Sequence, residues 1–448
     1  MENFVVSSMK LSGGIYAFAG KMCSVFECKE SLLLYDKITA NGEVKLVSHK
    51  GKTAYLANIK KLAKPKHIEY SNNELGMIAK KMDTKLKKAA KELIAAFFSG
   101  APISVRFHGD GDGAAGAVAL YSAFMAMQNG CNRLSYGIRW APQRGIAYTY
   151  ESMYSDLVFF KGYKSIEKPK IVIIDFGTTP QSNEAIEGIN KNADIIWLDH
   201  HPIAKGFLGE KLDFYINPVQ YGGSSDFTAG YLACLFAEML GSLDANLLKE
   251  ASLISDVSRY ANKANESALK AAVVLDFITG IKPYTGYLDG EASPAYMYKL
   301  LGSKDRVNNV YRYATDMMED AINIGESKAK RYKGISGIEI LVINFAHMTS
   351  KYAGYLLPGR YSSRLHEELE KKGKECITIV YFRNSISIRI SRNIAKDVKV
   401  LDIIDTITKD KGILNGGGHE SAASIVAIDE AHAKDALKKL LEYLGVKK

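Results

Sequence analysis

The chain has 448 residues, of which 47% are hydrophobic, and its 59 Lys and Arg against 49 Asp and Glu give a formal net charge of +10. This length exceeds one ordinary core and predicts about three domains, while the composition excludes a disordered or fibrous chain. The positive charge favours polyanionic partners, nucleic acid first.

No apolar run approaches the roughly 20 residues of a membrane span, and the N-terminus has no basic region ahead of an apolar stretch. The five cysteines are scattered and form no C-x-x-C pair, so neither a disulfide framework nor a zinc finger is supported. We therefore expect a cytoplasmic protein that has no membrane contact and keeps its cysteines reduced.

Residues 1–70 alternate short apolar or β-branched runs with turn signals such as Asn41-Gly42 and Lys50-Gly51-Lys52. This pattern predicts a small N-terminal β module. An OB-like module that grips single strands and a purely structural one both fit the pattern.

From Asn73 the apolar residues recur at helical spacing, and this predicts a helix that ends near Gly100. Most of its lysines lie off the apolar stripe. We expect that basic face to be a solvated surface rather than a strip that tracks phosphates.

A predicted strand at residues 103–107 is followed at once by His108-Gly109-Asp110-Gly111-Asp112-Gly113 and a helix of small residues. The interleaved glycines remove side chains that would block an ion or a phosphate. A calcium loop would need ligands spread over about 12 residues and ending in Glu, which this segment lacks. A plain turn is the remaining alternative.

The same order recurs twice, because the apolar run 170–174 is followed by Asp175 and the run 193–198 by Asp199-His200-His201. Each polar group alone is common at a strand end. Because the carboxyl ends of parallel strands face one crevice, three such strands predict convergent side chains. Carboxylate and imidazole suit Mn²⁺ or Zn²⁺.

A fourth acid, Asp256, ends a helical pattern that begins at Leu247. We expect it to be buried and to bind a metal, because Arg259 is the only nearby charge that could satisfy it. The alternative is a surface acid at the end of a helix.

Residues 293–332 predict connecting helices, after which strands and helices return. The run Gly416-Gly417-Gly418-His419 is expected to present backbone N–H groups to an anion at the start of a helix. Arg389 and Ser391 on a predicted strand favour phosphate as that anion, although a glycine run is also typical of a plain loop.

In order and spacing, these segments resemble the DHH phosphoesterase family with its C-terminal DHH-associated domain, from about residue 96 to the end. The size, the charge and the N-terminal module are most similar to archaeal RecJ-like nucleases, some of which accompany the replication machinery. The chain departs from the RecJ-type pattern at Gly111, where Ala is usual, at Ser424, where Gly is usual, and before Asp256, where a glycine pattern is missing.

The resemblance implies an α/β fold with a parallel-sheet DHH catalytic domain, a smaller C-terminal α/β domain and the small N-terminal β module. The predicted boundaries are 1–70 for the β module, 71–280 for the catalytic domain, 281–332 for a helical connector and 333–448 for the DHH-associated, substrate-binding domain.

The resemblance also implies two Mn²⁺ ions, with Mg²⁺ as the alternative, and assigns roles to residues. Asp110, with His108, would hold one ion, and Asp175 would bridge. The other ion would be held by Asp112, His200 and Asp256. Asp199 would orient His200 or ligate weakly, and His201 would contact the scissile phosphate. A neighbouring phosphate would be held by Arg389, Ser391, Gly416, Gly417, Gly418 and His419.

These features favour a metal-dependent exonuclease that hydrolyses single-stranded DNA or RNA from an end. The resemblance implies a role in DNA repair or replication, with replisome or repair proteins as partners. The alternatives are an oligoribonuclease (nanoRNase) or a cyclic-dinucleotide phosphodiesterase, an inactive replication scaffold and an inorganic pyrophosphatase. The full set of acids counts against the scaffold, and the N-terminal module counts against the pyrophosphatase.

Overall fold

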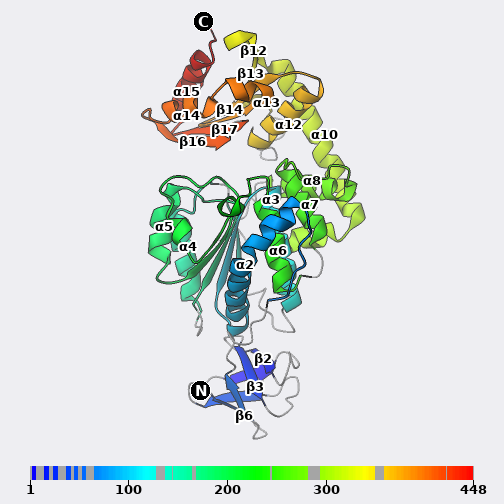
Figure 1. Cartoon of the computed structure of the whole chain (residues 1–448), viewed down its shortest axis with the longest axis vertical. Coiled ribbons are helices and arrows are strands. Elements are labelled where there is room, and N and C mark those ends of the chain that lie inside the picture. Colours follow the sequence, from blue (N-terminus) through cyan, green and yellow to red (C-terminus); the bar gives the residue numbers. More distant parts are fainter. Residues whose placement is uncertain are drawn as a thin grey trace. The chain divides into compact units, whose positions relative to one another are not determined.

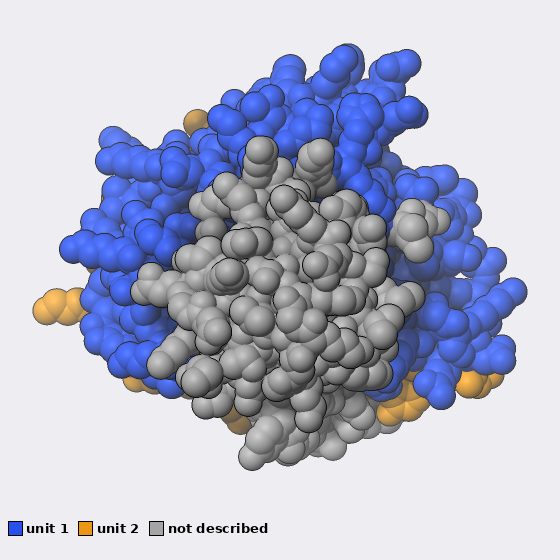
Figure 2. All heavy atoms as spheres, turned by 90° about the horizontal axis from the view of Figure 1, so that it is seen from below, with its two compact units in different colours: residues 1–279, 283–308 blue, residues 280–282, 309–448 orange. Residues whose placement is uncertain are grey.

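The structure is a computed structural model that describes residues 65–127, 137–143, 145–163, 168–242, 245–280, 293–348, 358–419 and 421–446, together with the backbone of six earlier strands. The chain divides into two compact units, which are residues 1–279 with 283–308, and residues 280–282 with 309–448 (Figure 1 and Figure 2). No helix in the described part of the chain has both the length and the hydrophobicity that a membrane crossing needs.

The first strands close into an antiparallel barrel in the order β1-β2-β3-β6-β5-β4, with β1 paired to both β2 and β4. The strands are β1 (Asn3–Val6), β2 (Ile15–Ala19), β3 (Ser24–Cys28), β4 (Lys37–Asn41), β5 (Lys45–Ser48) and β6 (Thr53–Leu56). The predicted β module is therefore present. The expected turns at residues 42 and 50–52 lie outside the described residues, and the OB-like identity stays a prediction.

Helix α2 (Glu74–Ser99) begins and ends where the sequence indicated. The Asn73 side chain accepts a hydrogen bond from the Gly76 N–H at 2.9 Å, and Gly100 ends the helix in the left-handed conformation, at φ 80°. Its apolar stripe is buried, including Met82 and Leu86.

The first unit is built on a five-stranded parallel sheet in the order β11-β10-β9-β7-β8. The strands are β7 (Ile103–His108), β8 (Ile138–Gln143), β9 (Lys170–Ile174), β10 (Asp194–Leu198) and β11 (Phe214–Ile216). Strand β9 lies between β7 and β10, so the segments that follow these three strands leave the sheet at adjacent positions along one edge.

Helices cover both faces of this sheet, which explains why its central strands are apolar along their whole length. In Figure 1, α4 and α5 lie on one face and α2, α3 and α6 on the other. Alternate side chains such as Ile173 and Trp197 pack with α4 and α5. The helices are α3 (Gly111–Met127), α4 (Tyr150–Lys161), α5 (Asn183–Ile189), α6 (Ala229–Leu240), α7 (Asn246–Ser255), α8 (Glu266–Gly280) and α9 (Pro294–Leu301).

Gly113 lets the start of α3 pass close to the end of β7. A Cβ at residue 113 would lie 2.8 Å from the His108 nitrogen and closer still to its carbonyl oxygen, both of which are backbone atoms. We expect Gly113→Ala to lower the free energy of unfolding by roughly 1–3 kcal/mol. Gly145→Ala is the control, because a Cβ there meets nothing within 4 Å. Equal thermal unfolding midpoints for the two variants would contradict this packing.

The second unit contains a six-stranded mixed sheet in the order β12-β13-β14-β15-β17-β16, in which β13 and β14 are parallel. The strands are β12 (Lys330–Lys333), β13 (Glu339–Asn344), β14 (Cys376–Phe382), β15 (Ser385–Ile390), β16 (Ile413–His419) and β17 (Ala422–Ala427). The helices are α10 (Lys304–Lys328), whose first residues belong to the first unit, α12 (Pro358–Lys371), α13 (Arg392–Asp397), α14 (Val400–Ile407) and α15 (Glu430–Tyr443).

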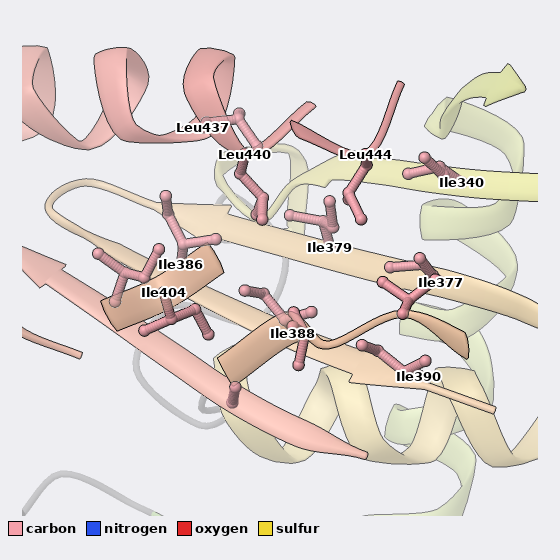
Figure 3. Close-up of a cluster of buried hydrophobic side chains, with 14 of the residues drawn as sticks. Ile340, Ile377, Ile379, Ile386, Ile388, Ile390, Ile404, Leu437, Leu440 and Leu444 are labelled. Atoms are coloured by element: carbon pink, nitrogen blue, oxygen red, sulfur yellow. The ribbon is translucent and has the colours of Figure 1, made fainter. Parts of the chain in front are cut away.

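Isoleucines from the central strands and leucines of α15 form the core of this unit (Figure 3). Ile377 and Ile379 of β14 face Leu440 in that cluster, whereas Thr378, between them, contacts His366 of α12. The sheet is thus covered on both faces, and a separate small α/β unit results.

Candidate metal centre

The sequence predicted eight side chains to be metal ligands or catalytic groups, and the structure brings all eight together. His108 ends β7, Asp175 follows β9 and Asp199 follows β10, while Asp256 comes from the end of α7. Their ligand atoms fall into three overlapping groups, in each of which all atoms lie within 4.8 Å of one another. The groups are Asp175, Asp199, His200 and His201; His108, Asp110 and Asp175; and Asp112, His200 and Asp256.

Asp175 lies at the centre of the cluster and has an unusual backbone. Its Oδ1 is 3.3 Å from His200 Nε2, and its Oδ2 is 3.6 Å from His108 Nδ1. Its φ of 68° places this non-glycine residue in the left-handed region, which costs on the order of 1–3 kcal/mol and is common at functional sites. The fold therefore holds this carboxylate in place against a local backbone preference.

A backbone carbonyl fixes the tautomer of His200. The Nδ1 atom lies 2.6 Å from the Ser225 carbonyl oxygen, which can only accept, so Nδ1 carries the hydrogen. The Nε2 atom then points at Asp175 and at Asp256, whose Oδ2 is 3.4 Å away. This is the arrangement in which a histidine offers Nε2 to a metal.

The side chain of Asp112 shows best whether the cluster suits a bound cation. Its side chain is fully buried, and its Oδ1 accepts hydrogen bonds from the Gly230 N–H at 3.0 Å and from the Ser252 hydroxyl. Its Oδ2 is also buried and has no hydrogen-bond partner. Because a buried carboxylate oxygen without a partner is costly, and this residue lies beside His200 and Asp256, the donor set fits a divalent cation.

Asp199 corrects one predicted role. Its Oδ1 accepts from His201 Nδ1 at 2.8 Å and from the His200 backbone N–H at 2.8 Å, and its Oδ2 accepts from the Thr178 hydroxyl. The prediction that Asp199 orients the His200 ring is therefore wrong, because Ser225 does so and Asp199 orients the ring of His201. The His201 side chain is 42% exposed and accessible to a substrate.

Asp256 was expected to be buried, and this expectation is wrong. It is the residue after the last turn of α7 and its side chain is 36% exposed, although it still faces His200. Arg259 does not neutralise it, because that guanidinium lies 2.6 Å from Glu74 and 3.6 Å from Asp226. Neither of these distant partners could be anticipated from the residues around Arg259.

The concentration of carboxylates shifts the pKa of several groups in the metal-free site. Burial, and then the charges of Asp175 and Asp256, raise the pKa of Asp112 well above its usual range. Partial desolvation and the Asp175 carboxylate, opposed by His200, raise the pKa of Asp256 to about 6. Burial by itself would lower the pKa of His200, but the Asp256 and Asp175 carboxylates outweigh it and raise the pKa. The cluster therefore retains protons that a cation would replace.

These shifts predict how the stability of the metal-free protein depends on pH. The raised pKa values of Asp112, Asp256 and His200 mean that the folded state holds protons that the unfolded chain releases. Stability therefore falls as pH rises above about 4, through about 6 for Asp256, and above 6.5 for His200. Saturating Mn²⁺ should flatten this slope, since it displaces those protons. Thermal unfolding midpoints measured in chelator and in Mn²⁺ test this expectation. Identical slopes, or a metal-free slope unchanged in Asp256→Asn, would contradict it.

Comparisons with known proteins bear on the fold. No family model matches the sequence. An uncharacterized protein of Methanocaldococcus jannaschii is 23% identical over 404 residues, which cover 79% of this chain and 53% of that protein, so the chain spans about half the length of the curated relative it matches. The DHH domain of a member of a ribosomal protein family matches with a TM-score of 0.74 at 23% identity, covering 87% of this chain and 97% of that one. This chain has the DHH-domain fold.

The α/β fold class predicted from the sequence is thereby confirmed, with a parallel sheet in the first unit of the DHH fold and a smaller mixed sheet in the second. A crystal structure of exonuclease RecJ bound to manganese also matches this chain, at 17% identity and a TM-score of 0.43. The match covers 84% of this chain and 95% of the RecJ chain.

The second unit of this DHH-fold chain holds the predicted phosphate-binding residues. Of these, Arg389 is the one with a charged side chain that is suited to binding a phosphate. Its guanidinium donates to Ser363 Oγ at 2.9 Å and to the Gly359 carbonyl at 3.2 Å. Burial lowers its pKa to about 10. No carboxylate among the described residues lies within ion-pair distance of it, so its charge is uncompensated there.

Ser391 and the glycine run differ from their predictions. Ser391 is only 2% exposed, and its Oγ accepts from the Cys376 N–H at 3.2 Å, which contradicts a substrate contact through its hydroxyl. Gly416, Gly417 and Gly418 lie in β16 and pair with β17, so the prediction that they begin a helix is wrong. The register does place His419 opposite Ala422, which is opposite Arg389, although the His419 side chain lies outside the described part.

Several residues that support the centre were not found from the sequence. Thr178, Ser225 and Asp276 carry no local signal, because each meets its partner only after the chain folds. Ser252 could have been found, since it lies on α7 in the turn before Asp256, which caps that helix.

Proposed function

We propose that this chain is a metal-dependent exonuclease that hydrolyses phosphodiester bonds of single-stranded DNA or RNA from an end. The observation that carries the proposal is the convergence of carboxylates and imidazoles at one edge of the parallel sheet, around an Asp112 Oδ2 that has no hydrogen-bond partner. Such a donor set suits hydrolysis assisted by divalent cations.

Two Mn²⁺ ions, or Mg²⁺ in their place, are the proposed cofactors. Asp110 with His108 would hold the first ion, and Asp175 would be a ligand shared by both ions. The second would be held by Asp112, His200 and Asp256, which already form a compact group. When bound, the cations would lower the pKa of the attacking water and neutralise charge on the phosphoryl oxygens.

The Asp199–His201 pair would act as the general acid that protonates the leaving group. Asp199 fixes the ring of His201 through Nδ1, at 2.8 Å. Partial desolvation by itself would lower the pKa of His201, but the Asp199 carboxylate outweighs it and raises the pKa, which favours the protonated ring. When it is protonated, this accessible imidazole could contact the scissile phosphate and donate a proton to the departing oxygen.

Arg389 is the proposed contact for a neighbouring phosphate, because a half-buried guanidinium without a carboxylate partner among the described residues favours an anion. The net charge of +10 supports a polyanionic substrate, and the N-terminal barrel is a second candidate surface for a single strand. Repair or replication proteins in the cytoplasm are the proposed partners.

Digestion of single strands labelled at either end tests the proposal. In Mn²⁺ we expect products that shorten from one end, and in chelator we expect none. Internal cleavage would contradict action from an end. Hydrolysis of dinucleotides or cyclic dinucleotides but not of long strands would favour the oligoribonuclease or phosphodiesterase alternative. The absence of Mn²⁺-dependent hydrolysis with every substrate would favour a scaffold.

A further inference from the structure

One carboxylate outside the proposed ligand set connects two segments that carry ligands. Asp276, on α8, accepts a hydrogen bond through Oδ1 from the Gly111 backbone N–H at 2.6 Å. The same oxygen accepts from the Ser255 hydroxyl at 3.2 Å. Gly111 lies between Asp110 and Asp112, and Ser255 directly precedes Asp256. A single oxygen atom therefore fixes the residues adjacent to three of the proposed ligands.

Asp276 does not belong to any of the three ligand groups, so its effect on a cation would be indirect. The bond to Gly111 holds the first turn of α3, in which Asp110 Oδ1 also accepts from the Gly113 N–H at 3.0 Å. The bond to Ser255 holds the last residue of α7, after which the chain turns to place Asp256 against His200. Both segments would be freer to move without this carboxylate.

The packing around Gly111 shows how closely the three segments meet. A Cβ at residue 111 would lie 2.7 Å from Asp276 Oδ1 and closer still to Ser255 Oγ. The glycine that replaces the alanine of the RecJ-type pattern is thus explained here by the space that Asp276 and Ser255 occupy. This close approach depends on where the Asp276 and Ser255 side chains lie beside residue 111.

We propose that Asp276 is a positioning residue that sets the spacing between the Asp110–Asp112 segment and Asp256, and hence the affinity of the centre for Mn²⁺. This inference rests on the proposed metal-dependent function. Partners that orient metal ligands typically change metal affinity by roughly 10- to 100-fold when they are removed. Asp276→Ala should weaken Mn²⁺ binding by that factor.

A conservative variant separates positioning from a need for charge or for helix packing. Asp276→Asn keeps an acceptor oxygen for both donors and should bind Mn²⁺ nearly as well as the wild type. Ser255→Ala removes one of the two hydrogen bonds and should cause a smaller loss than Asp276→Ala. Glu266→Ala is the control on the same helix, because Glu266 is exposed and pairs with Lys270.

Calorimetric titration of the full chain with MnCl₂, together with thermal unfolding and turnover at low and saturating Mn²⁺, tests the inference. We expect Asp276→Ala to unfold near the wild-type temperature, to bind Mn²⁺ more weakly and to regain turnover as Mn²⁺ is raised. Wild-type affinity in Asp276→Ala would overturn the inference. If that variant does not fold, wild-type affinity in Ser255→Ala would overturn it instead. A wild type that binds no Mn²⁺ would be a failure of the proposed function itself.

Discussion

Asp175→Asn is expected to give a folded protein whose kcat is lower by roughly 10³-fold or more, since metal assistance stabilises the transition state by several kcal/mol. Asp175 approaches both His108 and His200, at 3.6 and 3.3 Å. Asparagine removes its charge while keeping its shape, and it tolerates the left-handed backbone at φ 68° better than most residues. Turnover with excess Mn²⁺ and circular dichroism are the measurements.

The matched control for this variant is Asp194→Asn. Asp194 begins β10, at the opposite edge of the same sheet, and pairs with Lys170 at 2.5 Å. We expect this control to keep wild-type turnover. A folded Asp175→Asn protein with full activity would refute the assignment of the centre, and a similar loss in both variants would trace the effect to general damage to the sheet.

His201→Gln is expected to bind Mn²⁺ normally but to lose roughly 10²- to 10⁴-fold in kcat, the usual contribution of a general acid. Exposure separates His201 from His200, because the His201 side chain is 42% exposed and the His200 side chain only 4%. A nucleotide p-nitrophenyl ester should restore most of the rate, because nitrophenolate leaves without being protonated. Binding by calorimetry and rates on the two substrate types provide the test.

His432→Gln is a closely matched control for the histidine variant. His432 Nδ1 also lies 2.8 Å from a carboxylate, Asp429, and its side chain is also 42% exposed, but it belongs to the second unit. Its replacement should leave turnover unchanged. Equal losses on the nucleotide and on the nitrophenyl ester in His201→Gln would contradict a proton transfer to the leaving group.

The gathering of Asp110, Asp175 and Asp199 could be predicted because it depends on local signals. Each follows an apolar run, and the parallel arrangement of such runs brings their carboxyl ends to one edge. The structure has this arrangement, with β9 between β7 and β10. The fold class followed from the same pattern, since strands that are apolar throughout require helices on both faces.

The partners of these side chains could not be predicted, because they come from distant parts of the chain. His200 depends on the carbonyl of Ser225, and the start of α3 depends on Asp276. The glycines of β16 show the same limit. A glycine run is compatible with a loop, a helix start or a strand, and the pairing with β17 decides among them.

The most direct test is an anomalous difference map from crystals grown with Mn²⁺. Two peaks about 4 Å apart are predicted, one beside His108, Asp110 and Asp175 and the other beside Asp112, His200 and Asp256. A map without any peak among these residues would contradict the metal centre and with it the proposed hydrolytic function.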